Sequence, residues 1–149
     1  MSQDKETIAG LIPHDLPFNR HLGIQVDGEM DGHVLCRLPF REDLAGDPQR
    51  GLLFGGALFA LLDFALGAAC GRAVAPERVV ATIDLRLDYA RSNEPGRDIL
   101  ASGECYRLTR QIAFARGSAY HHPDEPPLAS AQGTFMIYDA PAEWRERKA

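Results

Sequence analysis

The longest apolar run of the sequence contains one acidic residue. Residues 51–70 read GLLFGGALFALLDFALGAAC, in which Asp63 is the single charged side chain. A carboxylate among apolar residues loses its hydration and therefore needs a hydrogen-bond partner, a neutralising proton or an opening to solvent. Asp63 is consequently either a structural acceptor for a buried hydroxyl group or a carboxylate held in a cleft, where it can act as a general base or a nucleophile.

A pair of glycines, Gly55 and Gly56, lies shortly before this acid. If a helix begins there, its first backbone N–H groups have no partner within the helix and lie at its positive end. Without a side chain in the way, an acyl oxygen could approach these amides as in an oxyanion hole; an ordinary tight joint between loop and helix is the alternative. The eight residues from Gly55 to Asp63 span about 12 Å of helix. One helix therefore cannot place both groups on one carbonyl, whereas helices from two subunits could.

The elements that must position these groups follow from local patterns. Good helix formers predict a helix from Gly55 to about Arg72. Residues 81–89 alternate strictly, with apolar side chains at the odd positions, which predicts a strand with one buried face. Strands are expected at 23–30, 33–40, 81–89, 98–108, 112–121 and 129–138, with turns at 31–32, 93–96 and 123–127 and a loop at 41–54.

A helix that is apolar on every side must be covered on every side. We therefore expect an α+β fold in which a curved antiparallel sheet of about six strands wraps around one long central helix, completed by a second subunit. Residues 16–139 are expected to form this domain, with 1–15 as an N-terminal extension and 140–149 as a loose tail. Residues 51–70 are long enough to span a membrane, but Asp63 and the glycines of this run favour a buried core helix and no membrane contact.

Charge and cysteine usage exclude several classes of protein. The formal net charge of -5 argues against a nucleic-acid partner. Cys36, Cys70 and Cys105 form no C-x-x-C pair, so the sequence indicates neither a metal site nor a redox motif, and we expect three reduced thiols. The polar, acidic start of the chain lacks the features of a signal peptide. A cytoplasmic location is expected.

Residues 49–63, QRGLLFGGALFALLD, resemble the hotdog-fold acyl-CoA thioesterases, especially the phenylacetyl-CoA and 4-hydroxybenzoyl-CoA branch with its H-G-G-x(7)-[DE] motif. Residues 82–85, 89–91 and 131–135 also resemble strands of that group. The resemblance implies a hotdog fold, a homodimer assembled into a tetramer, and hydrolysis of an aromatic or medium-chain acyl-CoA to the free acid and CoA. No cofactor is implied, because coenzyme A is part of the substrate.

The same resemblance implies roles for individual residues. The amide of Gly55 in one subunit would polarise the thioester carbonyl, and Asp63 of the neighbouring subunit would attack it or activate water. Gln49 matches an amide-bearing residue before the helix, although the spacing is one residue shorter, and Thr82 matches a hydroxyl residue that holds the hydrolytic water. Phe54 stands where the motif often has histidine, so Phe54 and Gly56 would line the helix mouth for an apolar acyl group.

Coenzyme A carries phosphates, which guanidinium groups bind in bidentate fashion. By analogy with the family, Arg91 and Arg110, with Gln111 nearby, are the candidates for this contact. Solvated arginines at sheet edges are the alternative reading of each.

Two further functions fit the same pattern. A non-catalytic acyl-CoA binding or sensing protein would use the same cleft, and Phe54 in place of histidine favours it. A hotdog dehydratase or hydratase would need a histidine beside the carboxylate, which the helix mouth lacks. His121-His122 has no further ligand at readable spacing, so strand-end histidines are the better interpretation.

Overall fold

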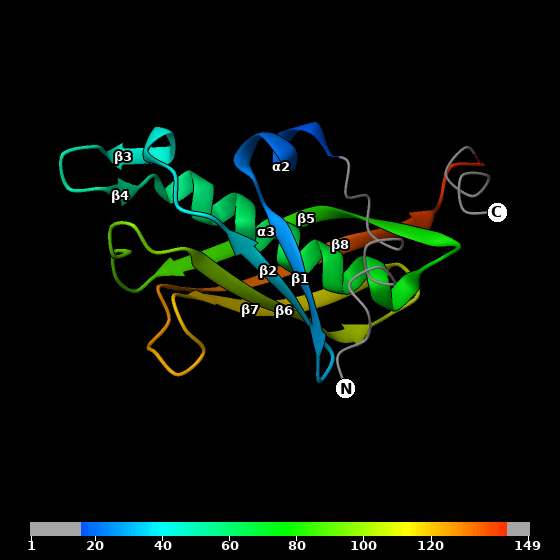
Figure 1. The fold of residues 1–149 in the computed structure, drawn as a ribbon. Coiled ribbons are helices and arrows are strands. Elements are labelled where there is room, and N and C mark those ends of the chain that lie inside the picture. The colour runs from blue at the N-terminus through cyan, green and yellow to red at the C-terminus, as the bar shows by residue number, and fades with distance from the viewer. Residues whose placement is uncertain (1–15, 143–149) are drawn as a thin grey trace.

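The computed structural model describes residues 16–142 and shows one sheet curved around one long helix (Figure 1). Six antiparallel strands lie in the order β1-β2-β6-β7-β8-β5, and a small hairpin forms a second sheet, β3-β4. The elements are α2 (Pro17–Leu22), β1 (Gln25–Met30), β2 (His33–Leu38), the 3-10 turn η1 (Glu42–Leu44), β3 (Ala45–Asp47), β4 (Leu52–Leu53), α3 (Gly55–Val74), β5 (Arg78–Tyr89), β6 (Ile99–Leu108), β7 (Ile112–Tyr120) and β8 (Ala129–Asp139). The expected α+β architecture is confirmed.

Several element boundaries differ from the prediction. The long helix α3 begins at Gly55 as expected but continues to Val74, and β5 begins at Arg78 rather than at Ala81. The predicted loop 41–54 contains η1, β3 and β4, which are too short to produce a periodic pattern. The N-terminal extension and the last seven residues of the predicted tail lie outside the described residues.

The sequence analysis also missed α2, although its ends carry recognisable signals. Pro17 occupies the first turn, where a missing N–H costs nothing. Gly23 follows the helix with a φ of 79°, the left-handed conformation that commonly ends a helix. A six-residue helix is too short for its apolar spacing to identify it.

Strand β5 does not keep the strict alternation that its sequence suggests. Its pairing with β8 shifts register between Thr82 and Asp84, so Ile83 is an extra residue in a β-bulge and is 52% exposed. Beyond the bulge Leu85 and Leu87 pack against the core. Thr82, which strict alternation would place on the opposite face from Leu85, bonds to α3 instead. The expectation that Ala81 and Ile83 share the buried face was wrong, because the bulge reverses the faces.

Helix α3 lies unusually close to the sheet because small residues face it. A Cβ atom on Gly103 would lie 2.6 Å from the carbonyl oxygen of Ala65, which belongs to α3. A Cβ atom on Gly117 would lie 2.2 Å from the carbonyl oxygen of Ser102 and 2.7 Å from a methyl of Leu66. Gly103 therefore sets the depth at which the helix backbone lies, and Gly117 makes room for the Leu66 side chain. Buried alanines extend this surface of small residues on the sheet, at positions 101, 113, 115, 119 and 131.

The core is built around α3. Ten of its twenty residues are buried, among them Leu61, Leu62 and Leu66 with no exposed surface. Among residues 16–142 it is the one helix long and apolar enough to span a membrane, and in this fold its apolar side chains fill the space inside the sheet. Cys36 and Cys70 are buried free thiols within the same core.

Replacing Gly103 with alanine should lower the free energy of unfolding by about 1–3 kcal/mol, because the new methyl group meets rigid helix backbone. Gly71→Ala is the matched control: its Cβ would lie 3.9 Å from the nearest atom, a methyl of Val80, and alanine is the better helix former by about 0.5–1 kcal/mol. Urea unfolding of both variants measures the difference. Equal stability of the two would show that the helix can move away from the sheet without cost.

Candidate active site

Asp63 lies on the side of α3 that faces β5. The hydroxyl of Thr82 donates a hydrogen bond to Oδ1 of Asp63 at 2.8 Å. Oδ2 has no hydrogen-bond partner among residues 16–142. The carboxylate is half-buried and lines a cleft of about 480 Å³ between α2, α3 and β5, which we call the Asp63 cleft. The acid is thus bonded to a hydroxyl and also open to a cavity large enough for part of a ligand.

The other candidate group is the amino end of α3. Phe54 precedes the helix and offers no side-chain cap, and within residues 16–142 the amide of Gly55 has no acceptor. Tyr89, at the end of β5, donates a hydrogen bond to the carbonyl oxygen of Gly55 at 2.8 Å. Gly55 lines a second cavity of about 370 Å³, the Gly55 cleft, together with residues of β4, Tyr89 and the segment after β5. The amide therefore opens into a cavity, as an oxyanion site requires.

The ring of Phe54 lies beside the helix mouth because Gly56 has no side chain there. A Cβ atom on Gly56 would lie 2.4 Å from the ring of Phe54, so only glycine lets the ring lie against the first helical turn. The ring remains 64% exposed. Phe54 lines the Gly55 cleft as predicted, whereas Gly56 supports the ring and is absent from the lining of that cleft.

Within one chain the carboxylate and the free amide line different cavities. Asp63 belongs to one cleft and Gly55 to the other, and neither cleft contains both. They are separated by two turns of a straight helix, or about 12 Å. The two candidate groups are therefore not brought together within one chain.

The structure brings together only some of the other predicted residues. Gln49 is exposed in the turn between β3 and β4 and lines neither of the two clefts. Arg91 lines the Gly55 cleft. Arg110 and Gln111 lie in the β6–β7 turn, beside the first residues of β5, and so at the opposite end of that strand from Arg91. A single subunit does not unite these candidate phosphate contacts.

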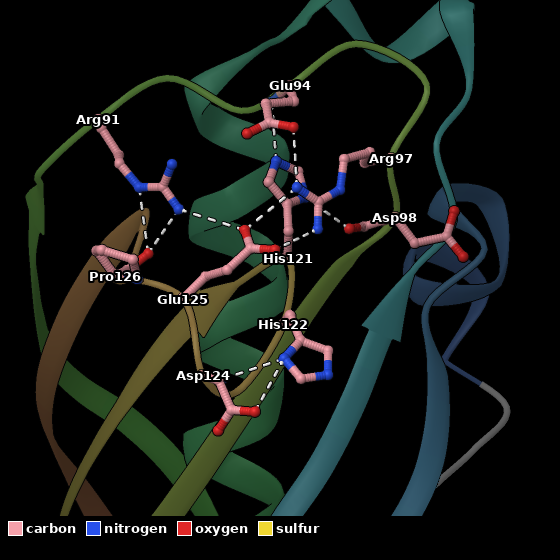
Figure 2. Close-up of polar contacts among 9 residues, drawn as sticks. All are labelled: Arg91, Glu94, Arg97, Asp98, His121, His122, Asp124, Glu125 and Pro126. Carbon is pink, nitrogen blue, oxygen red and sulfur yellow. Dashed lines mark hydrogen bonds and ion pairs between the residues drawn. The ribbon is translucent and has the colours of Figure 1, made fainter.

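The segment after β5 is fixed by a buried histidine. His121 is 6% exposed, and its Nε2 accepts a hydrogen bond from the amide of Glu94 at 2.8 Å (Figure 2). Since that nitrogen is an acceptor, Nδ1 carries the proton and donates to the carbonyl oxygen of Asp98 at 2.8 Å. The interpretation of His121 as a strand-end residue is confirmed, and its role is to bind the backbone of residues 94–98.

Ion pairs connect the same segment to the loop between β7 and β8. Arg97 donates to Glu94 at 2.8 Å and to Glu125 at 2.7 Å. Its guanidinium holds the pKa of both carboxyl groups below the usual range, and they raise the pKa of Arg97 in turn. Arg91 donates to the carbonyl oxygen of Pro126 through Nε and Nη2, at 3.1 and 2.7 Å (Figure 2).

Asn93 connects this anchored segment to the residues that precede α3. Its Oδ1 accepts a hydrogen bond from the amide of Leu53 at 2.9 Å, and its Nδ2 donates to the carbonyl oxygen of Gly51 at 3.5 Å. Leu53 is two residues before Gly55. The chain of contacts from His121 to Leu53 therefore fixes the strand that leads into the open amide end. Sequence reasoning missed it, because every link joins residues far apart in the chain.

His121→Ala should lower the free energy of unfolding by about 1–3 kcal/mol, since it removes the partner of two part-buried backbone groups and opens a void. Amide hydrogen exchange should become faster at Glu94 and Leu53. His122→Ala is the matched control, because this neighbouring side chain is 58% exposed and its loss should change stability by no more than about 0.5 kcal/mol. Similar losses in both variants would refute the anchoring role of His121.

One protein family shares the sequence pattern and the fold of this chain. Residues 50–127 match the Thioesterase superfamily. The medium/long-chain acyl-CoA thioesterase YigI of Salmonella typhimurium is 27% identical over 150 positions, which cover 91% of this chain and 94% of that protein. A crystal structure of a protein from Pseudomonas aeruginosa is 31% identical with a TM-score of 0.78, covering 89% of this chain and 98% of that one.

The PaaI protein of the E. coli phenylacetic acid degradation operon has the same fold, with a TM-score of 0.75 at 16% identity over 90% of this chain and 93% of that one. The resemblance seen in residues 49–63 is thus confirmed, and with it the predicted enzyme class, a thioesterase. The chain belongs to the thioesterase superfamily and has its hotdog fold.

Proposed function

We propose that this thioesterase hydrolyses an acyl-CoA to the free acid and CoA, with Asp63 as its catalytic carboxylate. The observation that carries the proposal is the Asp63–Thr82 pair at the wall of an open, largely apolar cleft. Thr82 fixes one carboxylate oxygen and leaves the other directed at whatever enters the cleft. Family membership supports the hydrolytic reaction, and the name of the Salmonella relative supports an acyl-CoA substrate.

The reaction divides its work between the two halves of the site. The free N–H of Gly55 donates a hydrogen bond to the thioester oxygen and stabilises the negative charge that develops there. Asp63 either attacks the carbonyl carbon, giving an acyl anhydride that water then cleaves, or removes a proton from an attacking water. In both routes the C–S bond breaks and CoA leaves as a thiolate that takes up a proton. Thr82 is placed to hold the water beside the carboxylate.

A homodimer would bring together the Asp63 carboxylate and the Gly55 amide, which one chain keeps apart. β5 is the outer strand of the sheet and is twelve residues long. Such an edge offers unpaired backbone groups to a second strand. Pairing of two β5 edges would bring the Asp63 cleft of one subunit near the helix mouth of the other. Arg91 of one subunit and Arg110 with Gln111 of the other could then share the CoA phosphates. Assembly of dimers into a tetramer remains a prediction from the family.

The alternatives find less support. Among the described residues no histidine lines the Asp63 cleft, which disfavours a dehydratase or hydratase. A non-catalytic acyl-CoA sensor would need neither the Asp63–Thr82 bond nor a free helix amide. The absence of a cofactor, of nucleic-acid and membrane contacts, and the cytoplasmic location are part of the proposal.

Asp63→Asn should lower kcat by about 10²–10⁴-fold, because the amide can neither attack nor accept a proton. The Thr82 hydroxyl can still donate to the amide oxygen, so melting temperature should change little. Thiol release from acyl-CoA measures turnover. Asp88→Asn is the control, an exposed acid on the same strand as Thr82 whose partner is Arg86. Undiminished turnover in Asp63→Asn would remove this residue from the mechanism.

Gly55→Pro tests whether the site is shared between subunits. Proline removes the amide proton but suits the first position of a helix, and Phe54 has the extended conformation that a residue before proline adopts, with ψ at 132°. Alone, Gly55→Pro and Asp63→Asn should each be nearly inactive. After mixed refolding, heterodimers would contain one intact site, which restores about a quarter of wild-type activity. Failure to regain activity, with heterodimers demonstrated, would place both groups in one chain.

A further inference from the structure

The Asp63 cleft continues along α3 well beyond the carboxylate. Gly67 and Gly71 lie one and two turns after Asp63 on the same helix face, and both line the cleft. β5 forms one wall through Val80, and α2 forms the other through Phe18. The result is a groove whose floor is the glycine face of α3 and whose catalytic end is Asp63.

The two glycines differ in what packing allows. A Cβ on Gly67 would lie 3.3 Å from the ring edge of the buried Phe135, which is a tight contact, whereas one on Gly71 would lie 3.9 Å from a methyl of Val80, an ordinary van der Waals distance. At Gly103, by comparison, the added atom would lie 2.6 Å from backbone. Glycine inside a helix is unfavourable relative to alanine. What the missing side chain provides at position 71 is therefore the open volume of the groove.

The polarity of the groove runs in one direction. The polar side chains that line it are Asp63 and Thr82 at the carboxylate end, Asn19 on the α2 wall and Arg78 at the start of β5, and the other lining residues are apolar. The Arg78 guanidinium is directed to the β6–β7 turn, where it donates to the carbonyl oxygen of Arg110 at 3.4 Å. A ligand that fits this sequence has a polarised head at the carboxylate and an extended apolar tail.

The length of the groove sets the length of that tail. From Asp63 to Gly71 the helix advances about 12 Å. Carbon–carbon bonds of about 1.5 Å at angles near 111° advance an extended chain by about 1.25 Å each. About nine or ten carbons therefore reach from the carboxylate to Gly71. A flat aromatic group would fill only the first part.

We propose that the acyl chain of the substrate occupies this groove and that Gly71, by leaving the groove open, sets how long a chain is accepted. The substrate class is then linear aliphatic acyl thioesters of about ten carbons or more. This inference rests on the proposed thioesterase function of Asp63. It differs from the expectation that Phe54 lines the acyl site: within one chain that ring lines the other cleft, and the groove along α3 is lined without it. It also favours aliphatic over aromatic acyl groups.

The test is the chain-length profile of Gly71→Leu. The new side chain blocks the groove eight residues from Asp63, so kcat/KM for decanoyl-CoA and dodecanoyl-CoA should fall by about tenfold or more, while that for butanoyl-CoA should stay within about twofold. Ala73→Leu is the matched control, because this exposed residue of the same helix does not line the groove. Its profile should equal that of the wild type. Phenylacetyl-CoA and benzoyl-CoA complete the panel.

Gly71→Ala provides a second variant that folds in any case. It should raise the melting temperature while lowering kcat/KM for dodecanoyl-CoA only, a combination that simple structural damage cannot produce.

Three outcomes would overturn the inference: an unchanged chain-length profile in Gly71→Leu, a loss of kcat/KM that is equal for all chain lengths, or a wild type that prefers the aromatic substrates. If the wild type hydrolyses no acyl-CoA, the proposed function fails instead. Titration calorimetry with decanoyl-CoA then tests the groove alone: binding to the wild type that Gly71→Leu abolishes supports it, and binding unaffected by the substitution, or absent, refutes it.

Discussion

The close approach of α3 to the sheet is the constraint on which the rest of the structure depends. Helix backbone lies against the sheet where Gly103 has no side chain, and the Leu66 side chain of the helix lies against Gly117. Because the interior is close-packed, this contact fixes both the depth and the rotation of the helix. Leucines and alanines then fill one side, and the opposite side of the same helix presents Asp63 to β5 and the cleft. The position of a polar group is thus decided by glycines that it never touches.

Two side chains of strand β5 contact α3, one at each of the two candidate half-sites. Thr82 bonds to Asp63, and Tyr89, seven residues later, bonds to the first helical turn. An uninterrupted strand would direct these two side chains to opposite faces, since their separation is odd. The bulge at Ile83 adds one residue and places both toward α3. One local irregularity in the edge strand therefore aligns the hydroxyl with the carboxylate.

The features of this fold that can be predicted from the sequence are those encoded in local residue patterns. The start of α3 and the number of long strands follow from helix formers and alternation. The bulge at Ile83 gives no such signal, because the alternation of residues 81–89 is intact in the sequence. The anchoring role of His121 and the cleft wall formed by α2 depend on contacts between distant segments. Gln49, assigned through family resemblance, lies in a turn and lines neither of the two clefts of its own chain.

Glycine has opposite uses on the two sides of α3, and the difference separates structural from functional constraint. At Gly103 the space of a side chain is occupied by helix backbone, so the glycine is required for packing. At Gly71 the nearest atom to an added Cβ would be 3.9 Å away, so the space is left open and the helix is less stable than it would be with alanine. A sequence selected for stability alone would fill that position. The open space lies in the same cleft as the carboxylate bonded to Thr82, which is the reason for assigning it to a ligand in the proposal above.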